Sequence, residues 1–139
     1  NEFWKIIHEL AAGNTSILVS TAYMDEAAQC HRVGLMLQGK ILAIDTPQNL
    51  IKNFPAPLYH LETETPYQTF LRLKESELKD CVQLFGSGVH ILDRKHLGPT
   101  VLSQKIAALN IILKNIAPIH PQFEDVFLEQ MEGILTSHG

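Results

Sequence analysis

Two adjacent carboxylates, Asp25 and Glu26, are the acidic pair best placed for chemistry, and they follow Met24 at the expected start of a short helix. Neighbouring carboxylates can bind a divalent cation, because hard cations take oxygen ligands. Acids in the first turn of a helix also interact favourably with the helix dipole without any metal. We favour the dipole role, since both residues follow Met24 directly.

Histidines and cysteines could bind a transition metal, but their spacing argues against it. No two of the seven histidines are four positions apart, the spacing that puts two ligands on one helix face: His8, His31, His60, His90, His96, His120 and His138. Cys30 and Cys81 form no CxxC motif, which is typical of two reduced thiols in a cytosolic protein. We therefore predict no metal site.

Glycines could cradle a phosphate, but the required arrangement is absent from this sequence. A phosphate loop needs the pattern GxxxxGK[ST], in which backbone N–H groups and the lysine hold the phosphates. The eight glycines include no such pattern. Gly86-Ser87-Gly88 is too short and lacks the lysine, so we interpret it as a plain loop. No residue of this chain is predicted to bind a cofactor.

The composition predicts a folded protein and argues against nucleic-acid binding. Of the 139 residues, 45% are hydrophobic and 19% charged, and the formal net charge is −4. No cluster of five or more Lys and Arg provides the basic patch that nucleic acids require. The apolar run at residues 106–113 is far shorter than the roughly 20 residues of a bilayer span, so we expect membrane association only through a partner.

The first half of the chain has the pattern of an α/β protein. Gly13-Asn14 suits the end of a first helix, and Gln38-Gly39 suits a hairpin turn. Thr46 is a plausible N-cap before Pro47, which favours the first turn of a helix. The expected elements are a helix at 3–11, a buried strand at 15–20, a helix at 24–30, strands at 32–37 and 40–44, and a helix from 47. The residues Asn1–Lys5 resemble the middle of a helix, so we expect the chain to begin inside a larger protein.

Residues 53–57 interrupt the pattern and are the predicted boundary between a domain at 1–54 and a second domain at 55–139. In the second, we expect a helix over 66–85 with a break near Ser76 and an amphipathic helix over 101–114. Strands are expected at 58–64, 89–93, 96–100 and 115–119, and a last helix at 122–133. This order matches a small ferredoxin-like α+β domain followed by a terminal helix.

The stretch from Ile17 to Ala27 resembles the switch region of ABC ATPases, in which a buried strand ends in Ser/Thr-Thr-His before a Tyr/Phe-Met-Asp-Glu-Ala helix start. The resemblance continues through Cys30-His31-Arg32-Val33, Leu37–Ala43 and Thr46–Leu50. Phe3–Leu10 resembles the helix after the D-loop of that family. Phe123–Leu128 resembles the "LEDVF" helix of drug-export-type subunits. The resemblance implies the tail of a P-loop ABC ATPase domain followed by an accessory domain.

Ala22 stands where the family has its switch histidine, which contacts the γ-phosphate and helps to place the attacking water. A methyl group can neither donate a hydrogen bond nor transfer a proton. Three explanations remain open: a degenerate site of a tandem ATPase, a parent that is active through another residue, and an engineered or misaligned position. The "STAYM" variant, which resembles members with two ATPase domains, favours the first.

The resemblance implies the C-terminal portion of the ATP-binding subunit of an efflux-type ABC transporter. ATP and Mg would be cofactors of the parent only, and the partners would be a membrane permease and a second ATPase domain, on the cytoplasmic side of the inner membrane. The alternatives are a stand-alone regulatory or dimerisation module and a soluble, ribosome-associated type of ABC ATPase. We also expect the unpaired strand at 15–20 to favour self-association of this chain. The transported substrate is not predicted.

Overall fold

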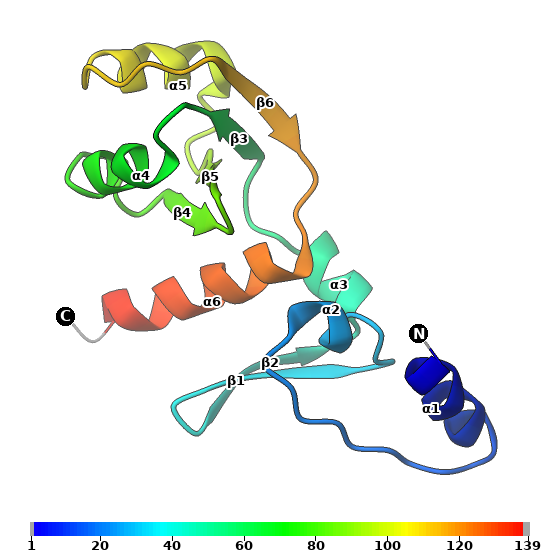
Figure 1. The fold of residues 1–139 in the computed structure, drawn as a ribbon. Helices are drawn as coiled ribbons and strands as arrows, with labels where there is room; N and C mark the ends of the chain where they lie inside the picture. The colour runs from blue at the N-terminus through cyan, green and yellow to red at the C-terminus, as the bar shows by residue number, and fades with distance from the viewer. Residues whose placement is uncertain (1, 138–139) are drawn as a thin grey trace. The chain divides into compact units, whose positions relative to one another are not determined.

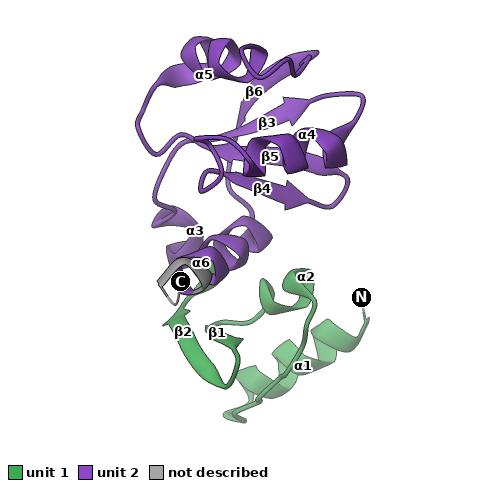
Figure 2. Ribbon diagram, turned by 90° about the vertical axis from the view of Figure 1, so that its left-hand side faces the viewer, with its two compact units in different colours: residues 1–48 green, residues 49–139 purple. Residues whose placement is uncertain are grey.

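The computed structural model describes residues 2–137, with the side chains described through residue 134, and divides the chain into two compact units. Unit 1 comprises residues 1–48 and unit 2 comprises residues 49–139 (Figure 2). The protein is a small mixed α/β chain with two antiparallel sheets. The division falls within helix α3 (Pro47–Lys52), and the predicted domain boundary at residues 53–57 follows that helix and stays a prediction.

Unit 1 contains helix α1 (Glu2–Ala12), helix α2 (Met24–Ala27) and the two-stranded hairpin of β1 (Val33–Leu37) and β2 (Lys40–Asp45). The hairpin turns at Gln38 and Gly39, whose φ angles are 49° and 76°. Positive φ at both central residues is typical of a type I′ turn, which matches the twist of the strands. The hairpin predicted from Gln38-Gly39 is therefore confirmed.

The predicted strand at residues 15–20 is wrong for the described chain. These residues pair with no strand, and the Leu18 side chain is 99% exposed. A parallel strand is stable only with neighbours on which to form its hydrogen-bond ladder, and none lies beside this segment in unit 1. Helix α2 is also shorter than predicted, because it ends at Ala27 and turns fill the stretch to Cys30.

Unit 2 is built on a four-stranded antiparallel sheet in the order β4-β5-β3-β6, with helices along it (Figure 1). The strands are β3 (Leu58–Glu62), β4 (Val82–Phe85), β5 (Gly88–Leu92) and β6 (Asn115–Ile119). The helices that accompany them are α4 (Pro66–Lys74), α5 (Gly98–Ala107) and α6 (Phe123–Ser137).

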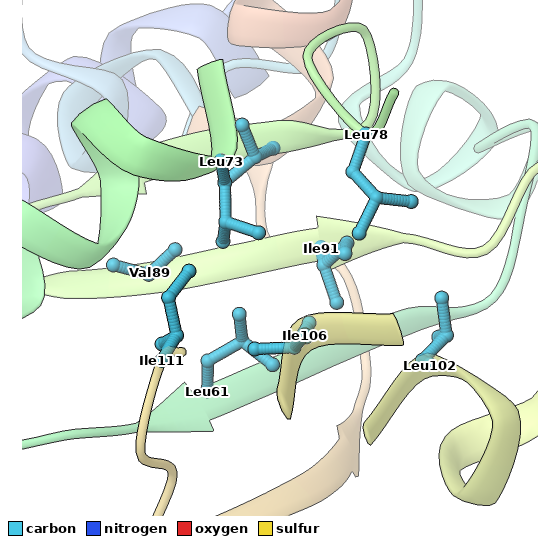
Figure 3. Packing of buried hydrophobic residues seen from close by; sticks show 9 residues of the cluster. Leu61, Leu73, Leu78, Val89, Ile91, Leu102, Ile106 and Ile111 are labelled. Carbon is cyan, nitrogen blue, oxygen red and sulfur yellow. The ribbon is translucent and has the colours of Figure 1, made fainter. Parts of the chain in front are cut away.

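The hydrophobic core of unit 2 lies between one face of the sheet and helices α4 and α5. Side chains alternate along a strand, so Val89 and Ile91 of β5 face this core while His90 faces the other way. Figure 3 shows the buried aliphatic side chains that meet there. The fully buried members include Leu61, Leu73, Val82, Val89, Ile91, Leu102 and Ile106.

Two predictions for unit 2 assign the wrong type of secondary structure. The helix predicted to reach residue 85 ends at Lys74, and Val82–Phe85 is strand β4, which forms a hairpin with β5 through Gly86 and Ser87. The strand predicted at 96–100 is absent: His96 and Leu97 precede α5, and residues 98–100 form its first turn, which Pro99 suits. The predicted break near Ser76 is confirmed, since Ser76 Oγ donates to the Leu73 carbonyl (2.7 Å) and ends the helical run.

The outer edge of the sheet is strand β6, which contains Pro118 opposite Tyr59 of β3. Proline has no N–H, so in a sheet it occurs at edges, where the missing donor faces away from the neighbouring strand. Of the residues described, the free edges of this sheet are β6 on one side and the four-residue β4 on the other.

Candidate functional site

The segment that resembles the switch region runs from Ile17 to α2 and is organised by Thr21. The Thr21 hydroxyl donates to Glu26 Oε2 (2.6 Å), and Thr21 Oγ1 accepts from the Tyr23 backbone N–H (3.0 Å). The Tyr23 carbonyl in turn accepts from the N–H groups of Glu26 and Ala27. Thr21 therefore sets the turn into the helix by local hydrogen bonds.

Ala22 is exposed and lies between the two residues that form this turn. Its neighbour Tyr23 is also exposed, with 72% of its surface accessible. The position resembling the switch histidine is thus accessible, but it carries a methyl group, which contributes no hydrogen bond. Within the described part of the segment, the polar side chain next to it, Thr21, is already bonded to Glu26.

Asp25 and Glu26 both lie in the first turn of α2, as their position after Met24 predicts. The hydrogen bond to Thr21 occupies Glu26, while the side chain of Asp25 is exposed. Among residues 2–137, no group of three or more His, Cys, Asp or Glu side chains could hold a metal ion. The pair therefore has the geometry of acids at a helix N-terminus.

Within unit 1, His8 of α1 contacts the segment after α2, and the sequence alone does not predict this contact. His8 Nε2 lies 3.1 Å from the Gln29 carbonyl, and its ring lies beside that of His31 at 5.9 Å between centroids. Trp4, one turn earlier on α1, is 4% exposed and belongs to the small core of unit 1. Helix α1 therefore contacts, through His8, the segment at Gln29 and His31 that follows the switch-like turn.

Both cysteines are free thiols, in agreement with the sequence prediction. Burial raises the pKa of the Cys30 thiol, and the nearby Glu26 carboxylate adds to the rise. Burial also raises the pKa of the Cys81 thiol. A raised pKa keeps a thiol protonated at neutral pH, and the protonated form is a poor nucleophile and metal ligand. Neither cysteine is a candidate catalytic group.

Gly86 and Ser87 form the turn of the β4–β5 hairpin and Gly88 begins β5, so the interpretation as a loop is confirmed for the first two residues. Gly86 has a φ of +55°. A Cβ added to Gly88 would lie 2.8 Å from His60 Cε1. Gly88 is therefore needed for the close approach of the His60 ring rather than for phosphate binding.

Unit 2 contains a buried polar cluster that sequence reasoning missed, on the sheet face opposite the aliphatic core. His90 Nδ1 donates to Asp125 Oδ1 (2.7 Å), and Asp125 Oδ2 accepts from the Gln122 backbone N–H (2.8 Å). The His90 ring stacks on Phe85 at 4.5 Å and meets the His60 ring edge-on at 5.5 Å. The cluster joins β3, β4 and β5 to the first turn of α6.

Two further ion pairs hold α6 against the rest of unit 2. Arg94 makes a two-pronged contact with Glu129 (2.8 and 2.7 Å), and Lys74 of α4 pairs with Glu132. The hydrogen bonds to Glu129 raise the pKa of Arg94 above its usual value, although burial opposes the rise. Helix α6, which begins with the "LEDVF"-like residues, therefore makes polar contacts with strand β5, with the loop after it and with α4.

Comparison with known proteins identifies relatives along nearly the whole chain. The chain is 30% identical over 142 aligned residues to the probable multidrug ABC transporter ATP-binding protein YbhF of Escherichia coli K12, and equally to YbhF of Shigella flexneri. Each match covers 99% of this chain and 24% of the relative. The daunorubicin resistance ATP-binding protein DrrA2 of Streptomyces coeruleorubidus is 38% identical over 50 residues, covering 35% of this chain and 16% of the relative.

These relatives belong to one class, the ATP-binding proteins of drug-export-type ABC transporters, and this chain is related to that class. The resemblance of the sequence motifs to ABC ATPases of the drug-export type is confirmed. The chain spans about a quarter of the length of the YbhF relatives. No family model matches the chain, and no solved structure matches it.

Proposed function

We propose that this chain acts as the C-terminal portion of the ATP-binding subunit of an ABC-type exporter. The observation that carries the proposal is the match to a multidrug ABC transporter ATP-binding protein over 99% of the chain. The motifs of the switch-like segment, the hairpin and the α6 start support it, because they follow one another in the order expected for such a subunit.

In this proposal the chain itself performs no ATP chemistry. Its sequence holds no GxxxxGK[ST] loop, and Ala22 cannot take the part of a switch histidine. ATP and Mg²⁺ would bind elsewhere in the parent subunit, where closure of two ATPase domains would drive a membrane permease. We favour a degenerate site in a tandem ATPase as the reason for Ala22.

We also propose that residues 58–119 form a ferredoxin-like accessory unit. The element order β3-α4-β4-β5-α5-β6 and the sheet order β4-β5-β3-β6 support this assignment. The unit would regulate or pair ATPase domains.

The partners and the cellular site follow from the same proposal. The permease and the second ATPase domain would place the parent subunit at the cytoplasmic face of the inner membrane. No helix within residues 2–137 is both long and apolar enough to cross a bilayer. In this proposal the permease therefore supplies the membrane attachment.

A second candidate function is a stand-alone regulatory or dimerisation module. The observation in its favour is that unit 2 has its own sheet and its own aliphatic core, which are features of an independently folding domain. A soluble ABC ATPase of the ribosome-associated type is the third reading of the same resemblance.

One experiment distinguishes these three functions. An affinity tag is placed on this chain in its own gene, and the tagged protein is isolated from membranes, ribosomes and the soluble fraction. An exporter subunit should be recovered from membranes as a larger ATP-hydrolysing polypeptide together with a permease. Recovery with ribosomes, or as a polypeptide without ATPase activity, would reject it.

A separate measurement tests the chemistry assigned to the chain. Titration calorimetry of the purified 139-residue chain with Mg-ATP should give no binding heat. Micromolar affinity would contradict the proposal that ATP binds elsewhere in the parent.

A further inference from the structure

A surface cavity of about 510 Å³, open to solvent, lies in unit 2 at the end of the sheet where β3 begins and where β5 and β6 end. Its lysine and histidine side chains are exposed. Three chain segments form it: the stretch from the end of α3 to β3, the loop after β5, and the residues after β6. Leu58 lies opposite both Leu92 and Ile119 in the sheet, so the ladder itself brings the three segments together.

The titratable side chains that line this cavity are one lysine and two histidines. Lys52, His96 and His120 line it, and no acidic side chain does. None of these three side chains forms a hydrogen bond or ion pair within the described residues 2–137. The neighbouring charges are already paired: Arg94 binds Glu129, and the two Asp93 oxygens accept from the N–H groups of Leu97 and Gly98 (2.8 Å each).

The cavity is held in shape by its backbone. Pro55, Pro57 and Pro121 line it, and proline rings fix the local φ. The Asp93 N–H donates to the Pro57 carbonyl (2.8 Å), which ties the loop after β5 to the start of β3. His96 adopts a φ of +53°, a conformation that non-glycine residues rarely take and that the surrounding structure must maintain.

We propose that this cavity binds an organic phosphate. Lysine donates charge-assisted hydrogen bonds to phosphate oxygens, and such bonds are about twice as strong as neutral ones. An imidazole N–H also donates to a phosphate oxygen. The apolar part of the wall, with Ile51 and Phe54, suits an apolar group joined to the phosphate. The shared chemistry is a phosphate ester, which could come from a soluble metabolite or from a lipid headgroup. The proposal does not depend on the ATPase parentage of the chain.

The test is a titration of the ¹⁵N-labelled 139-residue chain followed by nuclear magnetic resonance. The soluble probes are inorganic phosphate and phenyl phosphate. The lipid probe is phosphatidylcholine vesicles with and without phosphatidic acid. We expect saturable changes confined to residues 51–57, 94–98 and 119–122. Phenyl phosphate should bind more tightly than inorganic phosphate, because its ring can contact Phe54 and the prolines.

Two variants replace basic side chains of the cavity with neutral amides without a large change in shape. The double variant Lys52→Gln/His120→Gln should weaken binding by at least about tenfold, because it replaces the charge-assisted hydrogen bond of the lysine with a weaker neutral one and removes the His120 imidazole. His96→Asn provides a second test, since asparagine tolerates the positive φ at this position. Lys95→Gln is the matched control: it removes a positive charge from the same loop, does not line the cavity, and should change affinity by less than about twofold.

The outcomes separate the sources of the phosphate. Binding of the soluble phosphates that the double variant weakens supports a metabolite. Binding only to vesicles with phosphatidic acid, again weakened by the variant, supports a lipid headgroup. The proposal is overturned if no probe gives a saturable change, if the changes lie outside the cavity, or if Lys95→Gln weakens binding as much as the double variant. Amide spectra of each variant without ligand show that it is folded.

Discussion

Asp125 at the start of α6 accepts a hydrogen bond from His90 of β5 at 2.7 Å, and both side chains are buried. Asp125 also accepts from the Gln122 N–H, so one carboxylate both caps α6 and attaches it to the sheet. The residues are 35 positions apart in the sequence. No periodicity connects them.

Replacing Asp125 should destabilise unit 2 strongly. Asp125→Ala removes the cap and leaves the His90 ring without its buried partner, and breaking such pairs costs about 3 kcal/mol. Glu124→Ala is the control, since this neighbouring acid has no partner in the described chain and should cost less than about 1 kcal/mol. Urea unfolding followed by circular dichroism measures both. Equal effects of the two variants would mean that the pair contributes nothing beyond the helix dipole.

Gln83 is the residue for which we predict a gain in stability. It lies opposite His90 in the β4–β5 ladder and is 3% exposed, and within the described structure neither polar atom of its amide has a hydrogen-bond partner. Burying an unpaired amide costs free energy, so Gln83→Met should raise the free energy of unfolding by about 1 kcal/mol. The exposed Gln104→Met is the comparison. A loss of stability in Gln83→Met would show that a bound water or another group pairs with the amide.

A methyl group at position 88 should disturb the β4–β5 hairpin. The Cβ of Gly88→Ala would lie 2.8 Å from the His60 ring, and we expect a cost of about 1 to 3 kcal/mol. Adding His60→Ala should recover part of this loss, because the clash disappears. Gly133→Ala gives the contrast: it adds a methyl group to α6 where, in the described part of the chain, no atom beyond the neighbouring helix backbone lies within 4 Å, and it should stabilise the helix slightly. Thermal unfolding of the four proteins tests the set.

The unpaired segment at residues 15–20 should cause self-association of the 139-residue chain. Its Leu18 side chain is 99% exposed, and its backbone groups form no ladder. Leu18→Lys should therefore shift the chain toward the monomer at high concentration, while Lys40→Gln, in the hairpin of the same unit, should not. Light scattering over a concentration series is the measurement. A wild-type chain that stays monomeric throughout would contradict this expectation.

Ala22 provides the test of the degenerate-site proposal. In the complete ATP-binding subunit, Ala22→His should raise ATP turnover at this site, by up to about 100-fold if the imidazole alone is missing. Ala28→His, at an exposed position just after α2, should leave turnover unchanged. Wild-type turnover as high as that of Ala22→His would show that another residue replaces the histidine.

Local signals in the sequence predicted much of the fold. Gln38-Gly39 specifies a turn by backbone chemistry alone, and Pro47 and Ser76 mark helix ends in the same way. The errors arose where a segment depends on its neighbours. Val82–Phe85 is a strand because it pairs with β5, and the run at 15–20 is not one because nothing in unit 1 pairs with it.

The candidate sites were less predictable than the fold. The replacement at Ala22 is visible in the sequence once the motif around it is recognised. The His90–Asp125 pair and the basic cavity are not, because each is created by chain segments that only the folded sheet brings together. The cavity combines Lys52, His96 and His120 from three such segments.

Pro118 has a consequence for how large the unit 2 sheet can become. A fifth strand docking on β6 would need a continuous row of donors along its outer side, and proline interrupts that row at the fourth residue of this five-residue strand. Growth of the sheet by strand addition is therefore obstructed on this side. A partner that approaches unit 2 on this side must therefore bind through side chains. Binding there depends on which side chains the two surfaces carry, whereas pairing of strands through backbone hydrogen bonds would not.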